Sequence, residues 1–196
     1  MKILFIDRDG VINKDPGGWT KHNYVTDPKD LRFIPGSLEA LKQLRNRGYK
    51  VIIVSNQGGI SKGYFSVGHL DRVNKKMMDE VSKAGGEILE AFYCVHKDED
   101  NCDCRKPKTG LLEMAAKKYG FNPRDAYFVG DSHVDVTAGK ILGTKTIFVL
   151  SGKFTVEDVK TWRDKPSYIF KDLKAAVSWI LEKDKRKAIR ASKREE

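Results

Sequence analysis

The stretch ILFIDRDGVIN, residues 3–13, places four apolar residues directly before two acids that are two positions apart. The apolar run, residues 3–6, predicts a buried β-strand that ends where the polar residues begin. Two carboxylates as close as those of Asp7 and Asp9 repel one another unless they are hydrated or paired. The stretch therefore predicts either a cation between the acids or a division of roles, in which one acid attacks and the other handles protons.

The size of the chain, 196 residues, is enough to bury the core of one domain, which we place at residues 1–182. Residues 183–196 are predicted to form a basic C-terminal tail, the solvated and fraying end of the last helix. The formal net charge of +10 favours anionic partners, either phosphate compounds or nucleic acid. No apolar run has the length of a membrane span, and the N-terminus does not have the pattern of a secretory signal. We therefore expect a cytoplasmic monomer that has no contact with the membrane.

Strand-like and helix-like segments alternate along the chain. Apolar or β-branched runs predict strands at residues 3–6, 50–56, 90–95, 126–131 and 144–150. Helical spacing predicts helices at residues 37–47, 66–84, 110–120 and 133–142, with Thr109 capping the third, and a last helix capped by Asp172. This alternation predicts an α/β fold, a Rossmann-like three-layer sandwich whose central parallel sheet has about five strands. The connections leave no room for a large cap domain.

Polar side chains follow the predicted strands at the points where these strands end. They are Asp7 and Asp9 after the first strand, Ser55 and Asn56 after the second, Arg105 and Lys106 after the third and its loop, and Asp131 after the fourth. Ligands of parallel sheets bind beyond the carboxyl ends of the strands, so we expect these groups to meet at one edge. Carboxylate oxygens suit Mg²⁺, and a lysine with a hydroxyl can hold phosphoryl oxygens. A carboxylate can also attack phosphorus as a nucleophile.

Each of these motifs is weak when it is taken singly. An Asp-x-Asp pair is more often a solvated turn, SNQGG a simple turn, and GDSHVD a helix cap formed by Asp131 or Ser132. Their order, and their shared position after successive strands, favour one functional site instead.

The segments DRDGVIN, VSNQGGI, CRKPKTG and VGDSHVD resemble the four motifs of the haloacid dehalogenase superfamily of phosphohydrolases. The resemblance keeps the order of the motifs and covers roughly residues 1–150. FIDRDGVIN, NQGGISKGYF and CDCRKPKTGLL further resemble the subfamily that contains the D-glycero-D-manno-heptose 1,7-bisphosphate phosphatases and the histidinol-phosphate phosphatases.

The resemblance implies a role for each matching residue. Asp7 matches the nucleophile, and Asp9 matches the general acid that later becomes the base for the hydrolytic water. Ser55 and Lys106 match the groups that bind the transferring phosphoryl. Asp131 matches the Mg²⁺ ligand, together with Asp7 and the backbone carbonyl of Asp9. Further expected roles are substrate contacts by Asn56 and Arg105 and indirect support of the metal by Asp135.

All three cysteines fall in one short segment, CVHKDEDNCDC, which begins at Cys94. An odd, clustered set in a cytoplasmic chain points to a metal rather than to disulfides. Cys94, His96, Cys102 and Cys104 together offer three thiolates and one imidazole, the ligand set of a closed structural Zn²⁺ site. The similar phosphatases carry the same Cys-x-His and Cys-x-Cys pairs. The loop runs directly into Arg105 and Lys106, so the zinc is expected to fix the backbone that aims Lys106.

The expected activity is hydrolysis of a phosphomonoester through an aspartyl-phosphate, with the 7-phosphate of D-glycero-D-manno-heptose 1,7-bisphosphate as the leading substrate. Histidinol phosphate is the nearest alternative, and a polynucleotide 3′-phosphate is a third. A zinc-bearing nucleic-acid-binding module is an alternative of another class, which the net charge and the zinc pattern favour. It leaves the clustered acids unexplained, and we see no stripe of basic and aromatic residues that would bind a strand. The expected partner is therefore a small phosphorylated sugar, gripped in part by the loop 14–36 through Trp19, Lys21, His22 or Tyr24.

Overall fold

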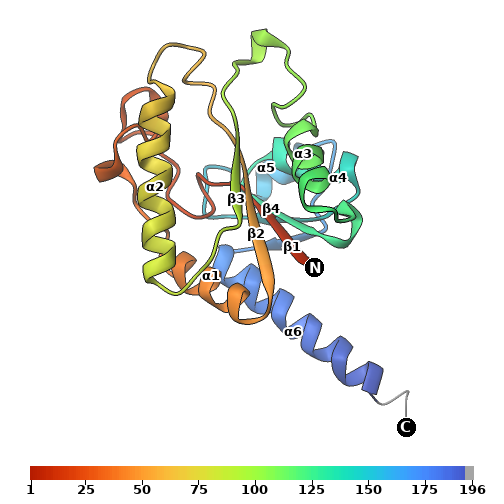
Figure 1. Cartoon of the computed structure of the whole chain (residues 1–196). Helices are drawn as coiled ribbons and strands as arrows, with labels where there is room; N and C mark the ends of the chain where they lie inside the picture. Colours follow the sequence, from red (N-terminus) through yellow and green to blue (C-terminus); the bar gives the residue numbers. More distant parts are fainter. Residues whose placement is uncertain (193–196) are drawn as a thin grey trace.

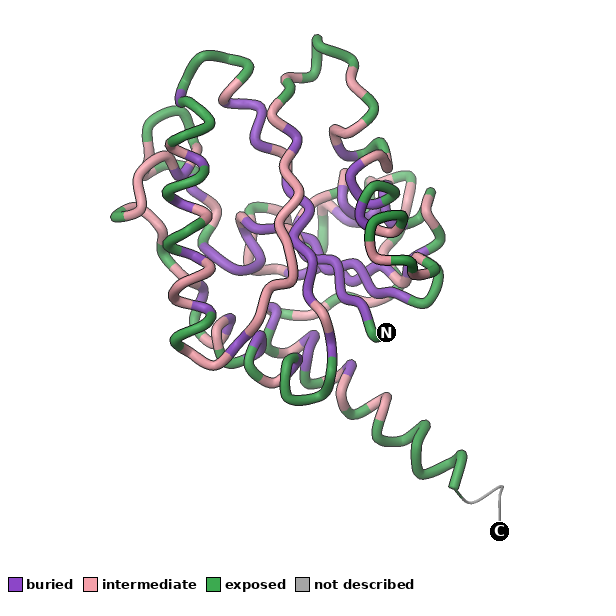
Figure 2. Tube along the Cα trace, viewed as in Figure 1, coloured by how far each residue is buried: buried purple, intermediate pink, exposed green. Residues whose placement is uncertain are grey.

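A six-stranded sheet forms the centre of the computed structural model, which describes residues 1–192 (Figure 1). Its strand order is β3-β2-β1-β4-β5-β6, and every pairing between neighbours is parallel. The strands are β1 (Lys2–Ile6), β2 (Tyr49–Asn56), β3 (Glu90–Cys94), β4 (Tyr127–Gly130), β5 (Lys145–Val149) and β6 (Tyr168–Phe170). The strands β1, β2 and β4 are almost wholly buried, as their apolar and β-branched runs predict (Figure 2).

Helices cover both faces of this sheet. They are α1 (Ser37–Asn46), α2 (Val67–Lys83), α3 (Gly110–Tyr119), α4 (His133–Leu142), α5 (Val156–Thr161) and α6 (Leu173–Ser192). Buried residues of α1, α2 and α6 form one core cluster with the sheet. Residues of α3 and α4 form a second cluster on the opposite face, and α5 packs beside α4. The three-layer α/β prediction is therefore confirmed.

The prediction of about five strands is one short, because it lacks β6. That strand has only three residues, none of them fully buried, and an apolar run of this length is too short to predict a strand. It exists because it pairs with β5 at the edge of the sheet, which is a tertiary contact. The six-residue helix α5 was not predicted either.

The two predicted helix caps have different outcomes. Asp172 caps α6, since its Oδ1 accepts from the backbone N–H of Ala175 at 2.9 Å. Thr109 precedes α3, but its hydroxyl donates to Glu113 at 2.6 Å and does not cap the backbone, so that prediction is wrong.

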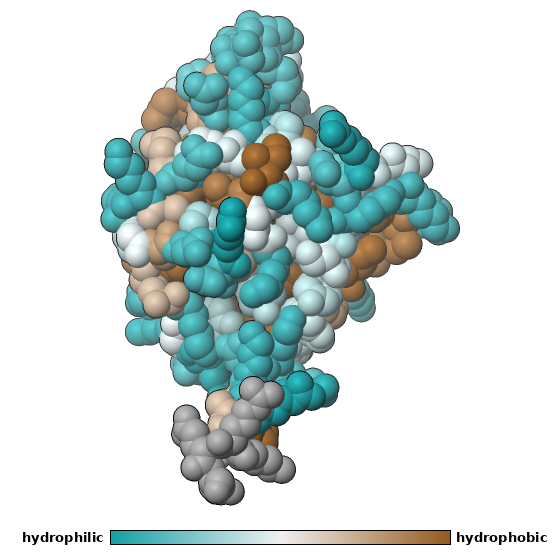
Figure 3. Space-filling model, turned by 90° about the vertical axis from the view of Figure 1, so that its right-hand side faces the viewer, coloured by the Kyte–Doolittle hydropathy of each residue, from teal (hydrophilic) through white to brown (hydrophobic). Residues whose placement is uncertain are grey.

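The C-terminal helix α6 extends away from the body of the molecule, and its outer part is exposed (Figures 1 and 2). The predicted basic tail, residues 183–196, begins inside this helix, and its last four residues lie outside the described part of the chain. The boundary at residue 182 stays a prediction. Among the helices of residues 1–192, none is long and apolar enough to cross a membrane. The face shown in Figure 3 is mostly hydrophilic, with small separate apolar patches.

Loops surround the side of the sheet at which its strands have their carboxyl ends. The connection from β1 to α1, residues 7–36, contains two short 3-10 turns, Lys21–Asn23 and Pro28–Asp30. The connection from β2 to α2 spans residues 57–66. Neither connection holds a separate cap domain in the structure of residues 1–192, so the edge is reached past loops alone.

Candidate active site

The strand order brings the predicted residues to one place. Strand β1 lies between β2 and β4, so Asp7 after β1 has Ser55 and Asn56 of β2 on one side and Asp131 after β4 on the other. A cavity of about 730 Å³ opens at this edge. All seven predicted catalytic, substrate-binding and magnesium-binding residues line it: Asp7, Asp9, Ser55, Asn56, Arg105, Lys106 and Asp131.

Three carboxylates gather at the floor of the cavity around one lysine. Carboxylate oxygens of Asp7, Asp131 and Asp135 all lie within 4.8 Å of one another. The buried Lys106 Nζ lies 3.1 Å from Asp7 and 2.6 Å from Asp135, and it donates to the carbonyl of Val54 at 2.7 Å. Burial alone lowers the pKa of Lys106, but the two carboxylates outweigh it and raise that pKa. Lys106 is therefore a fixed cation beside the acids.

The acids nevertheless outnumber the lysine that neutralises them. Burial raises the pKa of Asp7 to about 6, against the opposing effect of Lys106, and the charge of Asp135 adds to the increase. Burial, followed by the charges of Asp135 and Asp7, also raises the pKa of Asp131 well above its ordinary value. A cluster of hard oxygen donors that repel one another matches the ligand set that Mg²⁺ prefers. The residues present therefore fit a magnesium ion at this position.

This electrostatic frustration predicts an unusual dependence of stability on pH in magnesium-free buffer. A carboxyl whose folded pKa is raised binds its proton more tightly in the folded state, so stability decreases as pH rises from about 4 to about 6. In an Asp7→Asn variant this contribution is absent. We expect the wild type to lose roughly 2 kcal/mol relative to the variant across that range. Urea unfolding of both proteins at each pH measures the difference, in which contributions from groups that do not interact with Asp7 cancel. A difference that does not change with pH would contradict the assignment.

Two glycines make room for Asp131. A Cβ atom on Gly10 would lie 2.2 Å from Asp131 Oδ2, and one on Gly152 would lie 1.9 Å from the same atom. Gly10 also has a φ of +76°, in the left-handed region that favours glycine. The glycine after Asp9 therefore lets the β1 loop turn and lets Asp131 approach it.

The side chain of Asn56 holds the backbone of Lys106. Its Oδ1 accepts from the Lys106 N–H at 3.0 Å, and its Nδ2 donates to the Lys106 carbonyl at 3.0 Å. Arg105 turns back onto its own loop, where its guanidinium contacts Asp98 at 2.6 Å and donates to the carbonyl of His96 at 3.2 Å. Both residues line the cavity, and their predicted contacts with substrate stay predictions.

A polar shell that sequence reasoning missed surrounds Asp9. The fully buried Arg8 contacts both carboxylate oxygens, at 3.0 and 2.9 Å from Nη2. The amides of Asn13 and Gln57 donate to the same carboxylate at 2.7 and 3.0 Å. Burial alone raises the pKa of Asp9, but Arg8 and the two amides outweigh it and hold that pKa below its ordinary value. The signal available in the sequence was the position of an arginine between two acids at a buried strand end.

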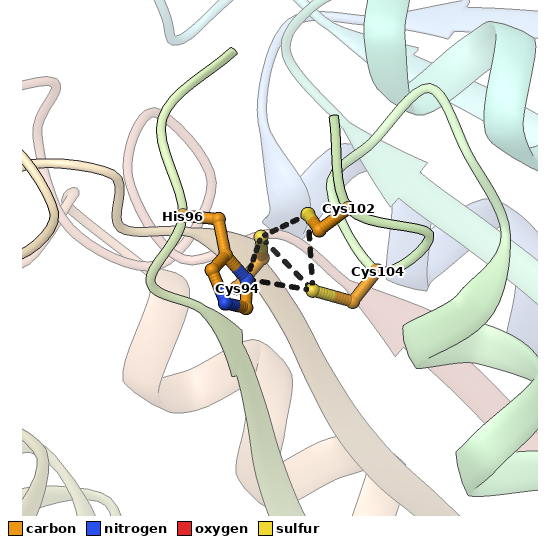
Figure 4. Close-up of side chains that lie close together, drawn as sticks. All are labelled: Cys94, His96, Cys102 and Cys104. Carbon is orange, nitrogen blue, oxygen red and sulfur yellow. Dashed lines mark hydrogen bonds between the residues drawn. The ribbon is translucent and has the colours of Figure 1, made fainter. Parts of the chain in front are cut away.

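The predicted zinc ligands lie together at the end of β3, whose last residue is Cys94, and in the loop that follows it (Figure 4). Cys94 Sγ is 3.6 Å from Cys102 Sγ and 3.2 Å from Cys104 Sγ. His96 points Nδ1 at the group, 3.8 Å from Cys94 Sγ and 3.3 Å from Cys104 Sγ. Tetrahedral Zn²⁺ with sulfur ligands at about 2.3 Å places those sulfurs about 3.8 Å apart. The four side chains can therefore hold a metal ion with little movement.

Several known proteins are similar to this chain in sequence or in structure. Residues 103–176 match the family model described as HAD-hydrolase-like. The 7-phosphatase for D-glycero-β-D-manno-heptose-1,7-bisphosphate of Pseudomonas aeruginosa is 34% identical over 92% of this chain and 98% of its own length. The enzyme of the same name from Pseudomonas putida is 38% identical over 78% of this chain and 85% of its own. The D,D-heptose 1,7-bisphosphate phosphatase of B. bronchiseptica, solved with magnesium and phosphate, has a TM-score of 0.85 at 29% identity and covers 93% of this chain and 99% of its own.

The chain belongs to the haloacid dehalogenase-like phosphatases. Within that family, its similarity to the heptose bisphosphate phosphatases extends over nearly the whole of both chains. The family resemblance seen in the motifs is confirmed, and so is the prediction of a phosphatase.

Proposed function

We propose that this protein is a magnesium-dependent phosphomonoesterase that removes the 7-phosphate of D-glycero-D-manno-heptose 1,7-bisphosphate. The observation that carries the chemistry is the buried Lys106, which bridges Asp7 and Asp135 at the floor of the cavity. The substrate rests on the names of relatives that match nearly from end to end. The cavity, about 730 Å³, is also of a size that small-molecule sites commonly have.

The carboxylates of Asp7 and Asp131 and the backbone carbonyl of Asp9 would hold the magnesium ion, with Asp135 supporting them through Lys106. When bound, the ion neutralises charge on the phosphoryl oxygens. Lys106 and the hydroxyl of Ser55 add positive and hydrogen-bonding contacts to the same oxygens. Asn56 fixes Lys106 through its backbone, so the position of the cation does not depend on a flexible side chain alone.

In the first half-reaction, a carboxylate oxygen of Asp7 attacks phosphorus, and the bond from phosphorus to the ester oxygen breaks. The departing sugar oxygen takes a proton from the Asp9 carboxyl, and Asp7 is left as an aspartyl-phosphate. In the second half-reaction, Asp9 accepts a proton from water and the water oxygen attacks the phosphorus. The bond from phosphorus to the Asp7 oxygen breaks, which releases phosphate and regenerates the Asp7 carboxylate.

The surroundings of Asp9 favour its ionised form before substrate binds, so the acid needs a source of protons in the complex with substrate. A phosphate monoester retains a proton on part of its population near neutral pH, since its second pKa is about 6. A phosphate placed beside Asp9 also raises the pKa of that carboxyl through like-charge repulsion. Transfer of the phosphate proton to Asp9 would load the acid for the first half-reaction.

We further propose that Cys94, His96, Cys102 and Cys104 hold a structural zinc ion. The support is the donor set and its spacing near that of a tetrahedral site. We expect one zinc per chain, retained through purification without added metal. Elemental analysis with a thiol titration measures it. Purified protein without zinc, in which all three thiols react freely, would contradict the site.

A panel of phosphate esters tests the proposed function. We expect kcat/KM to be highest for the heptose bisphosphate, lower for histidinol phosphate and lowest for a 3′-phosphorylated oligonucleotide, with all rates dependent on Mg²⁺. A preference for histidinol phosphate would overturn the substrate. No Mg²⁺-dependent hydrolysis of any ester, including an aryl phosphate, would overturn the enzyme itself and favour a binding module. We also propose that the enzyme is a monomer. We place it in the cytoplasm, where small sugar phosphates are available.

A further inference from the structure

The side chain of Arg8 is buried although it carries a positive charge. It is fully buried and is the largest side chain of this kind within residues 1–192. Lysine and arginine are almost never fully buried unless they are paired. Here the partner is Asp9, which lies next to it in the sequence and whose side chain stays 17% exposed at the cavity. The arginine therefore holds, from inside the protein, a carboxyl that faces substrate.

The contacts between the two residues define where the Asp9 carboxyl points. Arg8 Nε and Nη2 contact Oδ1 at 3.2 and 3.0 Å, and Nη2 also contacts Oδ2 at 2.9 Å. Asn13 and Gln57 each add one neutral contact to a different oxygen. Within the described part of the chain, Arg8 is the only cation bonded to Asp9, whereas Lys106 bonds Asp7 and Asp135. Asp9 is thus paired with a different cation from the one that pairs with Asp7 and Asp135.

The same shell leaves polar atoms without partners. Arg8 Nη1, Asn13 Oδ1 and Gln57 Oε1 are buried and make no hydrogen bond within residues 1–192. A buried polar group without a partner destabilises the folded state. Within residues 1–192, the side chains of this shell supply every hydrogen-bond donor that the Asp9 carboxylate receives. The shell therefore holds the carboxylate from several directions.

We propose that Arg8 is a positioning residue, which fixes the Asp9 carboxyl in the orientation that delivers a proton to the leaving oxygen. This inference rests on the proposed function and adds a residue to its machinery. The side chain of Arg8 acts only through Asp9. Its backbone N–H donates to Asp7 Oδ1 at 2.7 Å, a contact that a side-chain substitution leaves in place. Its planar fork matches a carboxylate at two oxygens, a geometry that lysine cannot reproduce although it keeps the charge.

A comparison of leaving groups tests the inference. A sugar alkoxide is a strong base and needs a proton to leave, whereas 4-nitrophenolate is a weak base and leaves without one. General acid catalysis contributes about 10²–10⁴-fold, so its loss appears with an alkyl phosphate and is largely hidden with an aryl phosphate. The substrates are the best sugar phosphate of the ester panel and 4-nitrophenyl phosphate. The variants are Arg8→Lys, Arg8→Met and Asp9→Asn, with Arg47→Gln, an exposed residue at the end of α1, as control.

We expect both Arg8 variants to lower kcat for the sugar phosphate by about 10²-fold and kcat for the aryl phosphate by about tenfold or less, with KM little changed. Asp9→Asn should show the same selectivity, and Arg47→Gln should show neither loss. Equal losses on both substrates would overturn the inference, because a general structural defect does not distinguish leaving groups. Wild-type protein that hydrolyses neither ester would overturn the proposed function, and this inference with it.

The double variant Arg8→Met/Asp9→Asn keeps the test decisive if a single Arg8 variant does not fold. Removing both members of a buried ion pair avoids leaving one charge alone, so the double variant is expected to fold. If Arg8 acts only through Asp9, the kcat of the double variant on each substrate equals the kcat of Asp9→Asn. A double variant that is folded, by thermal unfolding, and more than about tenfold slower than Asp9→Asn would show a separate role for Arg8.

Discussion

An Asp7→Asn variant is expected to fold and to bind substrate, and to lose turnover by on the order of 10⁴-fold or more. The amide cannot form the aspartyl-phosphate on which the proposed chemistry depends. Folding should survive because Asp7 is one of three crowded acids, and burial already disfavours its charge. Lys106 keeps its 2.6 Å contact with Asp135 when the carboxylate at position 7 is lost.

Three measurements separate these statements. Single-turnover kinetics report the chemical step, calorimetry with a sugar phosphate reports binding, and thermal unfolding reports folding. Asp125→Asn, an exposed acid away from the cavity, is the matched control and should keep wild-type rates. A folded Asp7→Asn protein with a rate near that of the wild type would rule out Asp7 as the nucleophile.

Brief treatment with a mild chelator is expected to abolish hydrolysis while zinc remains bound, and added Mg²⁺ is expected to restore the rate. The reason is the chemistry of the two ligand sets. The acids around Asp131 offer hard oxygen atoms to an ion that exchanges easily, whereas Cys94 and its neighbours offer thiolates and an imidazole, which hold Zn²⁺ tightly. Activity and zinc content are measured on the same samples. Activity that is indifferent to Mg²⁺ but follows zinc occupancy would reverse the two roles.

Replacing one zinc ligand should act through position instead. Cys102→Ala is expected to lower thermal stability and to lower kcat by about 10²-fold, since a displacement of about 1 Å at a reacting group can cost that much. The displacement would reach the active site along the chain, because Cys104 directly precedes Arg105 and Lys106. Asp103→Ala is a matched control in the same loop, because its side chain is fully exposed. A Cys102→Ala protein that lacks zinc and keeps full activity would show that the zinc loop does not affect catalysis.

The sequence by itself was enough for the alternation of elements, the motifs and the metal-ligand sets. Buried parallel strands leave continuous apolar runs, and amphipathic helices leave a helical period, so both are written in local sequence. The rule that ligands bind at the carboxyl ends of strands then places Asp7, Ser55, Lys106 and Asp131 in one site from the sequence alone. The candidate zinc ligands could also be predicted from the sequence, because all four lie within a segment of eleven residues.

Only the tertiary structure decided the features that depend on partners distant in the chain. Strand β6 exists because β5 provides an edge for it, and three residues leave no pattern of their own. The two-way amide contact from Asn56 to Lys106 joins residues 50 positions apart. The surroundings of Asp9 are the clearest case, since Arg8 and Gln57 are polar residues that a local reading places in a solvated turn. Folding buries both side chains around the Asp9 carboxylate, because a buried charge needs a partner or hydrogen bonds inside the protein.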